Sequence, residues 1–129
     1  VSLAGEVEIG DWVVIGGHCA IHQWVKIGDH VMLQGGTLLS KDVPPYITVR
    51  SDTSSYAGLN RIGLQRRGFT DEQLESLTKT CRILFQSDMN YLNACNEAEK
   101  SVPQSAERDA LIDFIRSSQR GVIKPYTSK

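Results

Sequence analysis

Aliphatic residues recur every six positions along the first third of the chain. The series runs without a gap through Leu3, Ile9, Ile15, Ile21, Ile27, Leu33 and Leu39. A second series of small or β-branched residues follows four positions later, as Val7, Val13, Cys19, Val25, Val31 and Thr37. A helix would repeat apolar residues every 3.6 positions and a single long strand every two. The spacing of six therefore predicts short strands, joined by sharp corners and stacked into coils.

The residues between the aliphatic positions support this interpretation. Gly10, Gly16 and Gly28 directly follow members of the first series, where glycine allows backbone angles that β-branched residues avoid. The pattern resembles that of the hexapeptide-repeat proteins, which fold as a left-handed parallel β-helix. The left hand is implied by this resemblance alone, because the general rule for parallel crossovers favours the right hand.

Two prolines mark the predicted end of the repeat. Pro44 and Pro45 have no N–H to donate to a strand ladder, and residues 46–49 predict one short strand before a polar surface loop at 50–56. We divide the chain into β-helix coils at 1–49, a connecting loop and substrate segment at 50–69, and a helical domain at 70–129.

The apolar spacing changes to that of helices after residue 69. Thr70, with Gln73 three positions later, forms a capping-box pattern ahead of an apolar face of Leu74, Leu77, Cys81, Leu84 and Phe85. A second helix is expected at 89–100, with Leu92, Cys95 and Val102 on its apolar side. A third begins at Ser105, carries Ala110, Leu111, Phe114 and Ile115, and stops at Gly121; residues 126–129 are expected to fray. The predicted fold is a β-solenoid followed by a small helical bundle.

Composition excludes several classes of protein. The 129 residues carry a net charge of −1, so no overall field recruits nucleic acid. The three cysteines lack the spacing of metal ligands, and we expect buried, reduced thiols in a reducing compartment. No apolar run approaches the roughly 18 residues of a membrane span, and no signal peptide is recognisable.

The first residue falls inside the repeat. Val1 opens in mid-register without Met or a cap, whereas solenoids normally begin with an atypical capping repeat. The repeat makes only about two coils, fewer than the roughly three that a stable solenoid needs. We therefore expect a truncated β-helix, the C-terminal part of a longer protein.

Two polar segments are candidates for chemistry. His22 and Gln23 occupy a corner where neighbouring repeats have glycine, and they are either part of a site or a solvated pair. Asn60, Arg61, Arg66 and Arg67 are either a solvated basic loop or a phosphate-binding segment, since guanidinium groups bind phosphate oxygens in pairs. We expect His18 and His30 to be surface or intersubunit residues.

One pair of glycines interrupts the aliphatic pattern. Gly35 and Gly36 form either a turn or a place where a ligand slides along the coil. No Ser-His-Asp set, phosphate-binding loop or metal-binding motif can be assembled from the chain.

Several segments together resemble one enzyme family. They are Leu3-Ala4-Gly5, Ile15-Gly16-Gly17, His22-Gln23-Trp24, His30-Val31-Met32, Asp42-Val43-Pro44-Pro45-Tyr46, Asn60, Gly63-Leu64-Gln65-Arg66-Arg67-Gly68-Phe69, and Arg116-Ser117-Ser118-Gln119-Arg120-Gly121. In this order they resemble the C-terminal half of the UDP-N-acetylglucosamine 3-O-acyltransferases. That family transfers a 3-hydroxyacyl chain from acyl carrier protein to the sugar 3-hydroxyl, the first step of lipid A biosynthesis.

The resemblance implies roles for particular residues. Gly5 matches the glycine whose backbone N–H stabilises the oxyanion. The substrate-binding positions are matched by His22, Gln23, Asn60, Arg66 and Arg67, and Gly35 matches the position that sets acyl-chain length. The family's general base lies in a His-Ile-Ala-His-Asp type of motif, which is absent from this chain. We therefore expect the fragment alone to be inactive.

One position departs from the family pattern. Glu6 stands where the family often has His, directly after Leu-Ala-Gly. A carboxylate cannot replace an imidazolium beside phosphates, so no role is assigned to Glu6.

The resemblance also implies partners and a location. We expect a cytoplasmic homotrimer that uses acyl carrier protein and UDP-N-acetylglucosamine, without a cofactor or metal. Two alternatives stay open: a non-enzymatic trimeric β-helix scaffold or binding module, and a related hexapeptide N-acyltransferase.

Overall fold

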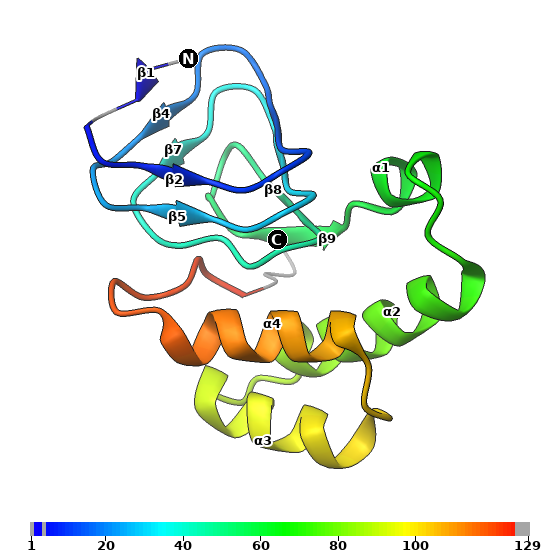
Figure 1. Ribbon diagram of the computed structural model, residues 1–129. Helices are drawn as coiled ribbons and strands as arrows, with labels where there is room; N and C mark the ends of the chain where they lie inside the picture. The colour runs from blue at the N-terminus through cyan, green and yellow to red at the C-terminus, as the bar shows by residue number, and fades with distance from the viewer. Residues whose placement is uncertain (1, 4, 126–129) are drawn as a thin grey trace.

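The computed structural model describes residues 2–3 and 5–125, which form a coiled β part followed by a helical part (Figure 1). Short strands of two residues each trace the coils. They are β1 (Ser2–Leu3), β2 (Glu8–Ile9), β3 (Val14–Ile15), β4 (Ala20–Ile21), β5 (Lys26–Ile27), β6 (Met32–Leu33) and β7 (Leu38–Leu39). Helices α2, α3 and α4 lie together on the side of the last coil (Figure 1).

Parallel pairing joins residues eighteen positions apart. Leu3 pairs with Ile21, and Ile21 pairs with Leu39; β2 pairs with β5 and β3 with β6 at the same interval. Three six-residue repeats therefore make one coil. The core contains members of both predicted series, namely Cys19, Ile21, Val25, Ile27, Val31, Leu33, Thr37 and Leu39.

The first coil is less well covered than the second. Ile9 is 40% exposed, whereas Ile27, its partner one coil later, is 3% exposed. Val7, Val13 and Ile15 are only partly buried. The inward column of apolar side chains is thus open at the end formed by the earliest described residues.

The coiled part continues past the two prolines, where the sequence analysis had ended the six-residue repeat and placed one short strand at 46–49. Strand β8 (Ile47–Val49) follows them and pairs in parallel with β6, with Met32 opposite Thr48. The interval here is sixteen, because the corner after β7 is two residues shorter. Pro45 lies directly against Gly28, where an added Cβ would come within 2.5 Å of the Pro45 nitrogen. Glycine at position 28 therefore allows the proline corner to stack on the coil before it.

Two elements in the segment at 50–69 were missed by the sequence analysis. Strand β9 (Tyr56–Leu59) pairs with β8 in antiparallel fashion, and helix α1 (Arg61–Arg66) follows at once. Both are too short to show a clear periodicity. Together they carry the chain from the coils to the helices (Figure 1).

The first predicted helix is confirmed. Helix α2 (Asp71–Gln86) begins after Thr70, whose hydroxyl accepts a hydrogen bond from the Gln73 N–H, while the Gln73 side chain accepts one from the Thr70 N–H. This is the expected capping box. The predicted apolar face is entirely buried.

The other two helices depart in detail from the prediction. In α3 (Tyr91–Ser101), Leu92 is 65% exposed, and the buried face is made of Ala94, Cys95 and Ala98. Helix α4 (Ala106–Ser117) ends before Gly121, which has a φ of 102° in the segment that follows and so is not the helix stop. The expected frayed tail at 126–129 lies outside the described residues.

The segment after α4 returns to the coils. Asp42 is buried and accepts hydrogen bonds from the Lys26 N–H (2.9 Å) and the Ser118 hydroxyl (2.6 Å). Its backbone forms a parallel bridge with Val122. Tyr56 of β9 stacks on Phe85 of α2 at 4.3 Å between ring centroids. These contacts join the helical part to the last coil.

All three cysteines are buried and unpaired, as expected. Among the described residues, no helix is both long and apolar enough to cross a membrane.

Candidate functional site

The corner after β1 and β4 carries three of the predicted site residues. Gly5 and Gln23 are both exposed and lie one coil apart, and the Trp24 N–H donates to the Glu6 carbonyl at 2.8 Å between their two turns. His22 is exposed beside Gln23. Neither side chain has a hydrogen-bond partner among the described residues, so both are available to a ligand.

Gly35 lies at a different corner, the one after β6. It stacks on the turn of the preceding coil, where a Cβ added to Gly35 would lie 3.2 Å from the Gly17 carbonyl oxygen. The N–H of Gly36 donates to the same oxygen at 2.8 Å. A side chain at position 35 would therefore crowd the corner as well as any ligand running over it.

Asn60 fastens α1 to the remaining corner, which lies between β5 and β6. Its side-chain amide donates to the His30 carbonyl at 2.9 Å. Its backbone N–H donates to the Tyr46 carbonyl at 2.8 Å. These two bonds fix the start of α1 against the coils.

Arg67 is held at the other end of α1. Its Nη1 lies 3.2 Å from Nδ1 of His30, and its guanidinium lies 5.5 Å from the centre of the Trp12 ring. Arg66 is exposed, and its side chain has no partner among the residues that the structure describes. The fold thus orients the side chain of Arg67, whereas no contact among the described residues orients that of Arg66.

A cavity of about 560 Å³ separates α1 from the outer face of the coils. The coil side of the cavity is mainly apolar and comes from Val14, Met32 and Thr48 of strands β3, β6 and β8. The opposite wall contains Leu59, Asn60, Arg61, Ile62, Gly63, Arg66 and Arg67. Guanidinium groups above an apolar floor suit a ligand with one anionic and one less polar part.

The environment of His30 keeps its imidazole neutral. Burial lowers the pKa of His30 below its ordinary value and the Arg67 guanidinium lowers it further, while the carboxylates of Asp29 and Asp11 act in the opposite direction. Arginine can only donate hydrogen bonds, so Nδ1 of His30 accepts and its proton sits on Nε2.

The structure brings together only part of the predicted site. Asn60, Arg66 and Arg67 line one cavity. Gly5, His22 and Gln23 share a second corner, and Gly35 lies at the third. Within one chain these three groups do not meet.

A family model described as UDP-N-acetylglucosamine O-acyltransferase, domain 2, matches residues 42–123, well over half of the chain. The chain belongs to this acyltransferase family. The matched segment contains Asn60, Arg66 and Arg67, together with helices α1 to α4.

Individual relatives and solved structures agree with the family. The chain is 37% identical, over 127 residues and 95% of its length, to the acyl-[acyl-carrier-protein]–UDP-N-acetylglucosamine O-acyltransferase of Burkholderia mallei (strain SAVP1), of which it covers 48%. Among solved structures, the UDP-N-acetylglucosamine acyltransferase of Bacteroides fragilis matches with a TM-score of 0.89 and 42% identity, over 92% of this chain and 46% of that one. The Arabidopsis enzyme matches with a TM-score of 0.81 and 30% identity, over 92% and 44%. The chain spans about half the length of the curated relatives it matches.

The sequence did not show how His30 packs within its own chain. We expected a surface or intersubunit position, and the structure adds that the ring is half-buried and packs against Tyr46 and Phe69. A signal was present: Trp12, His30 and Tyr46 are aromatic rings at successive turns of one corner, each with a positive φ. The six-residue spacing of inward aliphatic residues gives no information about these three rings, which lie on the outside of the coils.

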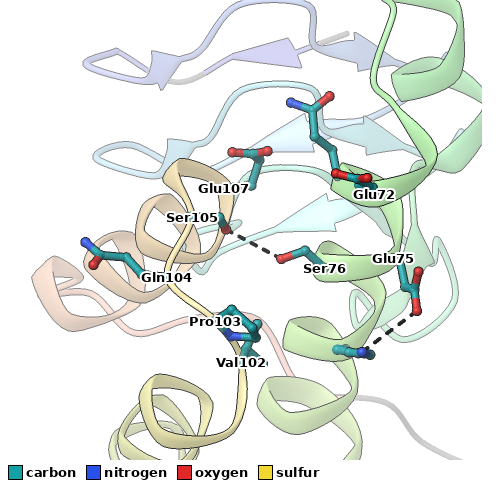
Figure 2. Close-up of a pocket in the computed structure, with 10 residues that line it drawn as sticks. Glu72, Glu75, Ser76, Val102, Pro103, Gln104, Ser105 and Glu107 are labelled. Atoms are coloured by element: carbon teal, nitrogen blue, oxygen red, sulfur yellow. Dashed lines mark hydrogen bonds and ion pairs between the residues drawn. The ribbon is translucent and has the colours of Figure 1, made fainter.

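A second cavity, of about 410 Å³, lies between α2 and the start of α4 (Figure 2). Its charged lining is Glu72, Glu75, Glu107 and a single lysine, Lys79, which pairs with Glu75 at 3.8 Å, so the acidic groups are in excess. The hydroxyls of Ser76 and Ser105 meet across the cavity at 3.5 Å. Carboxylates repel a diphosphate, so this cavity does not suit the sugar nucleotide named in the family's description.

Proposed function

We propose that this chain forms part of an enzyme that transfers a 3-hydroxyacyl chain from acyl carrier protein to the 3-hydroxyl of UDP-N-acetylglucosamine, the first step of lipid A biosynthesis. The observation that carries the proposal is the cavity beneath α1. It combines three arginines and an amide with an apolar floor, inside the segment that matches the acyltransferase family.

Each side of the cavity has its own part in the proposal. Arg66 and Arg67 bind the diphosphate, since a guanidinium donates two parallel hydrogen bonds to phosphate oxygens. Asn60 orients the nucleotide end of the ligand through the oxygen of its amide, because the amide nitrogen is engaged by the His30 carbonyl.

The remaining predicted residues serve the reaction and the donor. The backbone N–H of Gly5 stabilises the oxyanion of the tetrahedral intermediate, His22 and Gln23 contact the sugar and acyl chain, and Gly35 sets the length of chain accepted. The general base that removes the proton of the sugar hydroxyl comes from residues outside this sequence, because the chain lacks the family's His-Ile-Ala-His-Asp type of motif. By itself the 129-residue chain is therefore inactive.

We further propose that the coils form a left-handed parallel β-helix and that three copies assemble side by side. The support is the separation of Gly5, His22 and Gln23 from the cavity under α1. A neighbouring copy brings one chain's first corner to another chain's α1. The division into coils at 1–49, substrate segment at 50–69 and helical domain at 70–129 belongs to the same proposal. The enzyme is proposed to work in the cytoplasm.

An acyl-transfer assay tests the function. The intact protein, given 3-hydroxyacyl carrier protein and UDP-N-acetylglucosamine, should release free carrier protein and form the acylated sugar nucleotide. The 3-deoxy analogue of the sugar nucleotide is the matched control and should yield no product, because it lacks the acceptor hydroxyl. An intact protein that assembles normally but transfers nothing would refute the enzyme assignment and favour a scaffold.

A further inference from the structure

His30 sits inside a cluster of aromatic rings beside the cavity. Its ring stacks on Tyr46 at 5.7 Å between centroids and meets the edge of Phe69 at 5.2 Å, and these two rings lie 5.9 Å from each other. Tyr46 belongs to the corner of the next coil and Phe69 to the turn after α1. The imidazole is therefore fixed by packing from both sides.

Nδ1 of the fixed imidazole faces the guanidinium of Arg67. Nδ1 of His30 is 3.2 Å from Nη1 of Arg67, and the guanidinium also lies over Trp12. Of the five N–H donors on a guanidinium, this contact uses one and leaves the others for an anion in the cavity.

We propose that His30 is a positioning residue: as a neutral imidazole it orients Arg67 toward the nucleotide diphosphate, and on gaining a proton it releases Arg67. The inference rests on the proposed function, because it assumes that Arg67 contacts the sugar nucleotide. It adds a pH-dependent step to substrate binding at a residue to which the family resemblance assigned no role.

The chemistry of the contact makes it a switch. A neutral imidazole with its proton on Nε2 accepts a hydrogen bond at Nδ1, whereas an imidazolium donates from both nitrogens and accepts from neither. Protonation therefore replaces an attraction between His30 and Arg67 by a repulsion between two cations.

The other charged groups around His30 partly oppose this repulsion. Asp29 lies in the same turn and Asp11 one coil earlier, and both favour the imidazolium. The Asp29 carboxylate is already engaged by the Asp11 N–H at 2.7 Å. Tyr46 stays a neutral phenol, because burial raises its pKa and Glu107 of α4 and Asp29 raise it further. Burial and Arg67 outweigh the carboxylates, so His30 is neutral at neutral pH and gains its proton only in acid.

Two substitutions at His30 separate the hydrogen bond from the packing. In His30→Asn, a side-chain oxygen replaces Nδ1 as acceptor and does not titrate, and Asn tolerates the left-handed φ of 61° at this position. In His30→Phe, the ring remains between Tyr46 and Phe69 but the acceptor is lost. Aromatic residues hold the same backbone conformation at Trp12 and Tyr46, so Phe fits the turn.

The experiment measures the Kd of UDP-N-acetylglucosamine for the intact protein by calorimetry, from about pH 8 to about pH 5. The diphosphate of a nucleotide sugar does not titrate in this range. Wild-type affinity should fall about tenfold in acid, or roughly 1.4 kcal/mol. His30→Phe should bind about tenfold more weakly than wild type at neutral pH with a flat profile, and His30→Asn should bind as the neutral wild type does, also with a flat profile.

His18 supplies the matched control. It is an exposed histidine in the equivalent turn of another corner, with a φ of 62°, so His18→Asn and His18→Phe should leave the profile of the wild type unchanged. A second readout follows the pairing itself. Nitrogen NMR spectra should show that neutral His30 carries its proton on Nε2. In the Arg67→Met variant, the pKa of His30 should be higher than in the wild type, because the neighbouring positive charge is gone.

The possible outcomes separate this inference from the proposed function. If the intact protein does not bind UDP-N-acetylglucosamine, both fall. If it binds, and Arg67→Met weakens binding while His30→Phe does not, only the role of His30 is wrong. Two other results would also overturn the role of His30. One is a loss of affinity for UDP-N-acetylglucosamine in acid that persists in His30→Asn. The other is a pKa of His30 that is the same in Arg67→Met as in the wild type.

Discussion

Replacing Arg66 by Ala is the most direct test of the cavity under α1. Arg66 is exposed at the end of a short helix and lines the cavity beside Arg67. Its side chain contacts no partner among the described residues. The substitution should therefore leave the fold and its stability almost unchanged, and any effect on kinetics reports on a ligand.

The size of the effect follows from the bond that Arg66 is proposed to make. A hydrogen bond to a charged group contributes roughly 1.5–3 kcal/mol. The KM for UDP-N-acetylglucosamine should then rise about 10- to 150-fold. Because the diphosphate does not react, this contact stabilises the bound substrate and the transition state equally, so kcat should change little. Arg66→Lys should recover part of the loss, since it keeps the charge without the planar fork.

Steady-state kinetics of the intact enzyme, with the sugar nucleotide varied at saturating acyl carrier protein, provide the measurement. Arg82→Ala is the control, because Arg82 is an exposed arginine of α2 that does not line the cavity. An unchanged KM in Arg66→Ala would falsify the assignment and leave Arg66 as a solvated charge. A large fall in kcat with KM unchanged would contradict the argument that the diphosphate contact is uniform.

Three further results are expected. Gly35→Met in the intact enzyme should shift the preference to a shorter acyl donor, with Gly35→Ala as the control for crowding against the Gly17 carbonyl; an unchanged preference would make this glycine only a turn residue. Light scattering should give the mass of a trimer, and a monomer at micromolar concentration would contradict the proposed assembly. The free energy of unfolding should fall as the pH drops below about 6.5, because the unfolded chain then binds a proton that the folded, lowered-pKa His30 does not. This part of the pH dependence should vanish in His30→Phe and persist in His18→Phe, and equal slopes in the two variants would assign it to other groups.

The coils were predictable because their signal is local and repeated. Inward positions come every six residues, and the register of eighteen between strands such as β1 and β4 follows from three repeats per coil. The change of register at the last coil was not predictable. The aliphatic pattern does not show that the corner after Leu39 loses two residues. The sequence analysis accordingly ended the six-residue repeat at the two prolines and placed one short strand after them at 46–49.

The helical part shows a different limit. The buried face of α2 is made mainly of large apolar residues, and the sequence predicted all of it except Thr80. Helix α3 instead packs through Ala94, Cys95 and Ala98. Small residues allow helices to pack closely, but each buries little apolar surface and stands out little in the apolar pattern of a sequence. The larger Leu92 was therefore assigned to the core, although it faces outward with 65% of its surface exposed.

The candidate site was predictable by residue type but not by arrangement. The sequence showed the basic segment that contains Arg66 and Arg67. It could be a solvated loop or a phosphate site, and choosing between these two alternatives required the position of helix α1. The helix has six residues, too few for a periodic pattern, and its position depends on the bonds from Asn60 to His30 and Tyr46. These partners are 30 and 14 positions away in the sequence, at corners whose side chains point outward.

The geometry of a coil explains why one chain cannot complete the proposed site. Each coil has three corners, and a residue returns to the same corner after eighteen positions, or after sixteen at the last coil. Gln23 follows Gly5 by eighteen and shares its corner, whereas Asn60 is bonded to the next corner and Gly35 lies at the third. No movement of a side chain crosses from one corner to another, because the packed core of Ile21, Ile27 and Leu33 lies between them. If these residues act on one substrate, a corner of one copy has to face α1 of another, and the oligomeric state is then a condition for catalysis.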